Sequence, residues 1–145
     1  MSVRFWLASL LVGLAACGGD DGDDTTECVE PLAAGCAPSI PVDYDTIYTR
    51  ILQPKCGSAG FGTNCHGSPI DPKGGLRLYD PDIAYGDLIG RNGKARVLPG
   101  NAECSLLVER LESKDPLKRM PLSGSELDPG LRCAVRMWVD SGAAR

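Results

Sequence analysis

The stretch CGSAGFGTNCHG, residues 56–67, decides how this chain of 145 residues is interpreted. It contains two cysteines, Cys56 and Cys65, and the only histidine of the sequence, His66. Two thiols, with a histidine directly after the second, are the groups that a covalently attached haem requires. The thiols form thioethers with the vinyl groups and the adjacent imidazole binds the iron. The stretch therefore predicts a haem site made by Cys56, Cys65 and His66.

The same residues allow two other roles. Cys56 and Cys65 can pair as a disulfide, which would stabilise the fold by about 2–3 kcal/mol and leave His66 on the surface. A zinc ion can be held by Cys56, Cys65, His66 and one further thiolate. An oxidising compartment disfavours the zinc site, because it disfavours free thiols.

A haem held in this way needs a second iron ligand, and the chain has three methionines. Met1 is the first residue, and Met137 lies in a predicted helix beside Trp138, where packing in the core is favoured. Met120 lies in a loop directly before Pro121, whose ring fixes its own φ and restricts the residue before it. We expect Met120 to be the sulfur ligand, and packing of its side chain on the core is the alternative.

Four helices are predicted around this site. The first follows Asp43 as its N-cap, has apolar residues at i, i+3, i+4 and i+7 from Tyr44, and is ended by Pro54. Two others begin with an Asp-Pro pair, in which the aspartate caps the helix and the proline takes the first position. These two run from Pro81 through Leu88 to Gly90 and from Pro129 to the closing Gly142, and the remaining helix runs from Cys104 to Leu111. The predicted inner faces contain Tyr44, Ile47, Tyr48, Ile51, Cys104, Leu107, Val108, Leu111, Leu131, Ala134, Val135 and Trp138.

Long loops separate these helices. Residues 55–75 are rich in Gly, Ser, Asn and Pro, residues 113–127 are irregular, and both loops exceed the length that a plain helical bundle needs. Between them only Leu76–Leu78 is predicted to be extended. The fold class is therefore all-α, with a bound group expected to fill the space between the loops.

From about residue 47 to residue 144 the chain resembles the small cytochrome c-like domains of exported bacterial proteins. The resemblance implies one covalent haem c with His66 and Met120 as its axial ligands. A bonded histidine and methionine leave no open position for a substrate, which favours electron transfer over enzymatic chemistry. The matching stretches are Ile47–Cys56, Cys65–Gly67, Gly75–Leu78, Val97–Asn101, Ser105–Leu107, Arg119–Leu122 and Trp138–Ala143.

The chain departs from that family in the spacing of its cysteines. The usual motif has two residues between them, whereas residues 57–64 place eight there. Closing the longer loop costs about 1.2 kcal/mol more in chain entropy, and its three glycines keep it pliant. The wide spacing supports an alternative function, a disulfide-stapled, haem-free structural or binding lipoprotein of the same fold.

The first 17 residues predict export and attachment of lipid. Residues 5–16 are an apolar run of about 12 residues, which is typical of a signal peptide and too short to span a bilayer. The run ends in Leu-Ala-Ala-Cys at residues 14–17, which matches the bacterial lipobox. We therefore expect residues 1–16 to be a lipoprotein signal peptide and Cys17 to carry acyl chains that hold the protein on a membrane. The expected location is the cell envelope, facing the periplasm or the cell surface.

Acidic residues are concentrated near the N-terminus. Six of the 19 lie between residues 20 and 30, whereas residues 42–145 carry 14 Lys/Arg and 13 Asp/Glu. Residues 18–27 cannot bury apolar surface and predict a disordered tether. The chain thus divides into a signal peptide (1–16), a lipidated tether (17–41) and a haem domain (42–145). The sequence shows no clustered basic face of the kind that binds nucleic acid. The expected partners are therefore a membrane and a redox protein.

Seven cysteines in a chain exported to an oxidising compartment should not remain free thiols. Outside the lipidation and haem sites four remain, and they allow three pairings. We expect the local pair Cys28–Cys36 within the tether region. The second expected pair, Cys104–Cys133, would join the two C-terminal helices.

Overall fold

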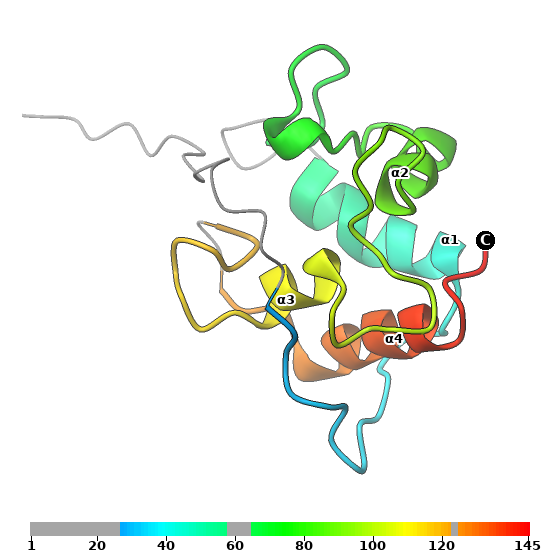
Figure 1. Ribbon diagram of the computed structural model, residues 1–145, viewed down its shortest axis with the longest axis vertical. Helices are drawn as coiled ribbons and strands as arrows, with labels where there is room; N and C mark the ends of the chain where they lie inside the picture. The colour runs from blue at the N-terminus through cyan, green and yellow to red at the C-terminus, as the bar shows by residue number, and fades with distance from the viewer. Residues whose placement is uncertain (1–26, 58–64, 123–124) are drawn as a thin grey trace, which may run out of the picture.

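A computed structural model of the chain describes residues 27–57, 65–122 and 125–145 (Figure 1). These ranges contain helices joined by long irregular segments, and no strand. None of their helices has the length and apolar character that crossing a membrane requires. The prediction of a small all-α domain with long loops is confirmed. The elements are α1 (Tyr44–Ile47), the π-helix η1 (Tyr48–Gly57), the 3-10 helix η3 (Lys73–Gly75), α2 (Pro81–Leu88), α3 (Leu106–Glu112) and α4 (Pro129–Asp140).

The helices α1 and η1 form one continuous segment that carries the chain to Cys56. Asp43 caps it as predicted, because its Oδ1 accepts a hydrogen bond from the Thr46 N–H at 2.7 Å. The predicted end at Pro54 is wrong, since the helix continues to Gly57. In an α-helix the proline ring would clash with the carbonyl four residues earlier, and the wider π-helical turn relieves that clash. The predicted apolar stripe of Tyr44, Ile47, Tyr48 and Ile51 is buried.

The Asp-Pro pairs begin α2 and α4 as predicted. Asp80 Oδ1 accepts hydrogen bonds from two backbone N–H groups at the start of α2, at 2.9 and 3.0 Å. Asp128 Oδ1 accepts one at the start of α4, at 2.8 Å. The helix α3 begins two residues later than predicted, because Cys104 lies in a turn whose N–H donates to Asn101 Oδ1 at 3.1 Å. These caps fix the helix starts next to the long loops.

An aromatic cluster forms one part of the core. The ring of Tyr44 lies 5.7 Å from that of Trp138 and 5.0 Å from that of Tyr85, between ring centroids. Such separations are typical of stabilising aromatic pairs. Trp138 Nε1 donates to the carbonyl of Ala144 at 2.8 Å, so the C-terminal residues are fixed over the cluster. The remaining fully buried large side chains are Ile47, Ile51, Leu52, Leu78, Leu88, Val97, Val108, Val135 and Val139.

Two disulfides fasten the N-terminal segment to the helices, and the pairing expected from the sequence is wrong. Cys28 pairs with Cys104, and Cys36 pairs with Cys133. The segment runs beside the starts of α3 and α4, where the Val29 N–H donates to the backbone carbonyl of Glu103 at 2.8 Å and the Ser39 N–H to that of Gly130 at 3.2 Å. Each cysteine of the segment therefore lies beside a helix rather than beside its neighbour in sequence. The chain packs on the domain from Cys28 onward.

Candidate haem site

His66 is held by the segment that follows it. Its Nδ1 lies 3.0 Å from the carbonyl oxygen of Lys73, and the Leu78 N–H donates to the carbonyl of His66 at 2.7 Å. The Lys73 N–H donates to the carbonyl of Cys65 at 2.6 Å, which closes the loop. Histidines that bind metals commonly donate their other ring N–H to a carbonyl in this way, which fixes the tautomer and the orientation of the ring. Donation from Nδ1 leaves Nε2 as the metal-binding nitrogen.

The surroundings of His66 favour its neutral form. Burial lowers the pKa of His66, and the backbone groups of Lys73 and Leu76 act in the opposite direction. The positive charge of Arg96 lowers the same pKa further. A neutral imidazole at neutral pH is the state that binds iron.

Cys56 is brought to the segment that holds His66. A Cβ on Gly57 would lie 2.7 Å from the carbonyl oxygen of Leu78, so only glycine permits the end of η1 to approach Leu78 this closely. Tyr48 Oη donates to the same carbonyl at 3.2 Å. Because the N–H of Leu78 binds the carbonyl of His66, this one residue connects the helix of Cys56 to the loop of His66.

The two predicted haem cysteines differ in chemical state. Cys56 is a free thiol, partly buried against the core, so the alternative disulfide Cys56–Cys65 is absent. Burial raises the pKa of Cys56 to about 11, which keeps it a neutral thiol at neutral pH. Cys65 is disulfide-bonded. A thioether to haem would use the same sulfur atom. Cys65 can therefore be in a disulfide or in a haem thioether, but not in both at once.

Several expectations fall outside the described residues. These are the signal peptide, Cys17, the tether up to residue 26, and most of the insert between the two haem cysteines. Within the described ranges no group of three or more His, Cys, Asp or Glu side chains is arranged to hold a metal ion. The zinc alternative therefore gains no support from the described part of the chain.

The two candidate methionines have different surroundings. Met120 is half-buried in the loop after α3, where its N–H donates to the carbonyl of Arg110 at 2.7 Å. Met137 lies on α4 with its Sδ 3.9 Å from Cys133 Sγ, one of the sulfurs of the Cys36–Cys133 disulfide. Met137 is thus packed against a crosslink, whereas Met120 is held on a loop by the end of α3. His66 and Met120 are positioned by different elements.

Arginine contacts next to the site were missed by sequence reasoning. Arg77 pairs with Asp87 through two hydrogen bonds, Nε to Oδ2 at 2.9 Å and the terminal nitrogen to Oδ1 at 2.8 Å. Hydrogen bonds from Arg77 hold the pKa of Asp87 below its usual range although burial acts to raise it. Arg77 is partly exposed, whereas Arg96 is buried against backbone carbonyls. The sequence signal for this contact is the position of Arg77 between Leu76 and Leu78, which both pack in or against the core. An arginine fixed next to the core needs a carboxylate partner.

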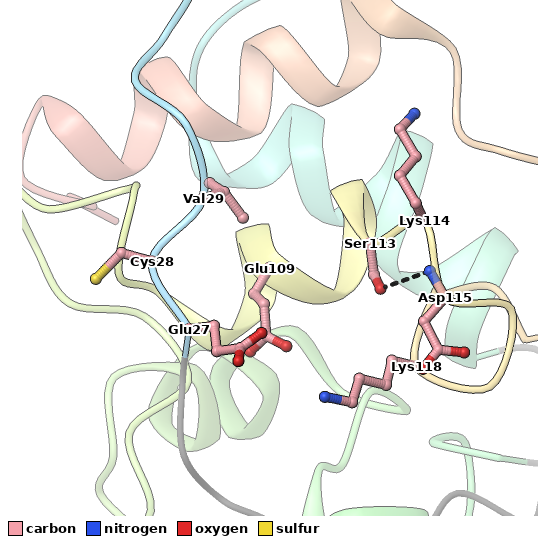
Figure 2. Close-up of a pocket in the computed structure, with 8 residues that line it drawn as sticks. All are labelled: Glu27, Cys28, Val29, Glu109, Ser113, Lys114, Asp115 and Lys118. Carbon is pink, nitrogen blue, oxygen red and sulfur yellow. Dashed lines mark hydrogen bonds between the residues drawn. The ribbon is translucent and has the colours of Figure 1, made fainter.

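A separate cavity of about 360 Å³ lies between the N-terminal segment, α3 and the loop after it (Figure 2). The carboxylate of Glu109 is buried there, and within the described structure its Oε2 has no hydrogen-bond partner. The predicted haem ligands do not line this cavity, so it is distinct from the candidate haem site. Its lining residues are Glu27, Cys28, Val29, Glu109, Ser113, Lys114, Asp115 and Lys118.

Comparison with known proteins agrees with the haem interpretation. Residues 63–124 match the family model described as Planctomycete cytochrome C. The matched range contains Cys65, His66 and Met120 and begins after Cys56. No curated protein and no solved structure matches the chain. The match confirms the predicted cytochrome c-like domain and supports haem-binding electron transfer, with a covalently bound haem, as its class of function.

The residues present fit such a group. His66 has one ring nitrogen directed to a carbonyl and is held neutral by burial. Cys56 offers a free thiol on the helix that packs against the same extended segment. A neutral imidazole and a free thiol are donor types that covalent haem attachment uses, and the second thioether would need Cys65 as a thiol.

Proposed function

We propose that this protein is a membrane-tethered electron carrier with a single covalent haem c. The observation that carries the proposal is the setting of His66, whose Nδ1 faces the Lys73 carbonyl within the matched range. This arrangement is the one expected for a histidine that binds iron through Nε2.

The bound haem would supply a one-electron couple between ferric and ferrous iron. His66 and Met120 would bind the iron, and Cys56 and Cys65 would hold the vinyl groups. Thioether attachment would require Cys65 as a thiol before the haem is joined. Two protein ligands leave no open coordination position, so we propose electron transfer and no enzymatic activity.

The proposed location follows from the lipobox at residues 14–17. Acyl chains on Cys17 would anchor the protein in the cell envelope, facing the periplasm or the cell surface. The partners would be this membrane and a redox protein that exchanges electrons with the haem.

A second candidate function is a haem-free lipoprotein of the same fold, stabilised by disulfides. It is favoured by the crosslinks Cys28–Cys104 and Cys36–Cys133. In this form the crosslinks would stabilise the domain by holding the N-terminal segment against α3 and α4.

The two functions are separated by expressing the chain with its own leader in cells that have a haem-attachment system. We expect haem that survives acid-acetone extraction and denaturing electrophoresis. Cys65→Ala should remove one thioether and Cys56→Ala the other, and the α band of the pyridine haemochrome should shift with each loss. Met137→Leu is the matched control and should leave haem content unchanged. A colourless wild-type protein would favour the haem-free lipoprotein.

A further inference from the structure

We infer that Arg96 is a positioning residue for His66. Its guanidinium fixes the turn at Gly74 and Gly75, and this turn places the Lys73 carbonyl that accepts the hydrogen bond from His66 Nδ1. The consequence for iron binding rests on the proposed function, whereas the contact network itself does not.

Arg96 is bound on several sides. It is 5% exposed, and one terminal nitrogen donates to the carbonyls of Asp87 at 2.9 Å and Lys94 at 2.8 Å. The other terminal nitrogen donates to the carbonyl of Gly74 at 2.5 Å. A guanidinium is always charged and presents its donors in one rigid plane, so it can hold separate carbonyls in a fixed arrangement.

The turn receives such an external contact. Gly74 has φ +58° and Gly75 φ +64°, and glycine adopts these left-handed conformations without strain. Within the turn the Gly75 N–H donates to the carbonyl of Pro72 at 3.0 Å and the Leu76 N–H to that of Lys73 at 3.3 Å, so contacts from outside add to a short hydrogen-bonded turn. Asn92 Nδ2 donates to the carbonyl of Gly75 at 3.1 Å, and a Cβ on Gly75 would lie 3.5 Å from Arg96. Side chains of the loop that follows α2 therefore hold two carbonyls of this turn, in addition to its own backbone hydrogen bonds.

The fixed turn determines the orientation of the imidazole. The Lys73 carbonyl precedes Gly74 directly and lies 3.0 Å from His66 Nδ1. Arg96 also lies close enough for its charge to lower the pKa of His66. If the contact from Arg96 is lost, the Lys73 carbonyl is held less firmly, and the Nδ1–H bond weakens. In a metal-bound state that bond raises the basicity of the ligand.

The test follows exchange of the His66 Nδ1 proton with solvent by NMR of the exported protein. His66 is the only histidine, so labelling with ¹⁵N-histidine gives the signals of one imidazole. Arg96→Lys keeps the positive charge but loses the planar set of donors. The matched control is Arg136→Lys, since Arg136 is also 5% exposed but binds Glu112 Oε2 at 2.9 Å and the Glu30 carbonyl at 2.7 Å.

We expect exchange about two- to tenfold faster in Arg96→Lys, as weakening of one hydrogen bond predicts, and unchanged exchange in Arg136→Lys. Haem staining of the same samples reports on the proposed function independently, because the exchange is measurable in reduced haem protein and in haem-free protein. Where haem is bound, Arg96→Lys should also raise the reduction potential, because a less basic imidazole stabilises ferric iron less. Unchanged exchange in Arg96→Lys, or equal acceleration in both variants, would overturn the inference.

Discussion

The two disulfides Cys28–Cys104 and Cys36–Cys133 should contribute almost equally to stability, although they close loops of different length. Their sequence separations are 76 and 97 residues, and each alone would stabilise the fold by about 4.5 kcal/mol in the chain-entropy model. The two loops overlap, however. Once one is closed, the path between the other two cysteines shortens to about 37 residues, and the second crosslink contributes about 3.8 kcal/mol.

The measurement uses paired variants and denaturant unfolding. Cys28→Ala/Cys104→Ala and Cys36→Ala/Cys133→Ala should each lose about 3.8 kcal/mol of unfolding free energy, and removal of both disulfides about 8 kcal/mol. The free energy of unfolding of a typical domain is about 5–15 kcal/mol, so a loss of about 8 kcal/mol is comparable with the whole. The quadruple variant should therefore be largely unfolded at 37 °C.

The same variants test the pairing directly. Under the observed pairing, Cys28→Ala/Cys104→Ala leaves the Cys36–Cys133 disulfide intact and creates no new thiol. Under the local pairing that the sequence suggested, the variant would leave Cys36 and Cys133 unpaired. Alkylation under denaturing, non-reducing conditions followed by mass spectrometry counts these thiols. Two additional alkylated cysteines in this variant would refute the pairing and the stability argument built on it.

Three further predictions concern the site and its supports. Met120→Ala should abolish the weak sulfur-to-iron charge-transfer band of the oxidised protein and lower its potential, because a methionine ligand raises the potential. Met137→Leu conserves volume and should leave both unchanged at a cost under about 1.5 kcal/mol; the reverse result would assign the ligand to Met137. Gly57→Ala places a Cβ 2.7 Å from the carbonyl of Leu78 and should cost about 1–3 kcal/mol in thermal unfolding, so an unchanged melting temperature would contradict the close approach. The pKa of Asp87 is lower in the folded protein than its unfolded value of about 3.9, so ionised Asp87 stabilises the fold at pH values above about 3.9. This contribution disappears as the pH falls through the lower pKa of the folded protein. When the pH is lowered below about 4, the urea concentration at the unfolding midpoint should therefore fall in the wild type and change less in Asp87→Asn. The same pH dependence in both proteins would contradict this linkage.

Local rules predicted the helices because their causes are local. The aspartate caps at Asp43, Asp80 and Asp128 satisfy N–H groups two or three residues away, so the sequence alone predicts where these helices begin. The end of the first helix was different. Pro54 normally stops an α-helix, but the π-helical register that accommodates it depends on packing of the whole segment.

Contacts between distant segments were beyond local reasoning. The disulfide partners of Cys28 and Cys36 are decided by where the N-terminal segment crosses α3 and α4, and the sequence alone did not predict this path. The family pattern indicated His66 and Met120 because the motif places them directly. It did not predict Arg96, whose role follows from a turn that becomes visible only in three dimensions.

The most direct test of the central claim is the intact mass and optical spectrum of the exported, purified protein. We predict the mass of the mature chain increased by one haem, with the sharp Soret and α bands of a reduced low-spin cytochrome and the haem on the peptide that contains Cys65 and His66. A colourless protein without the mass of haem, in which Cys65 is still disulfide-bonded, would contradict the account.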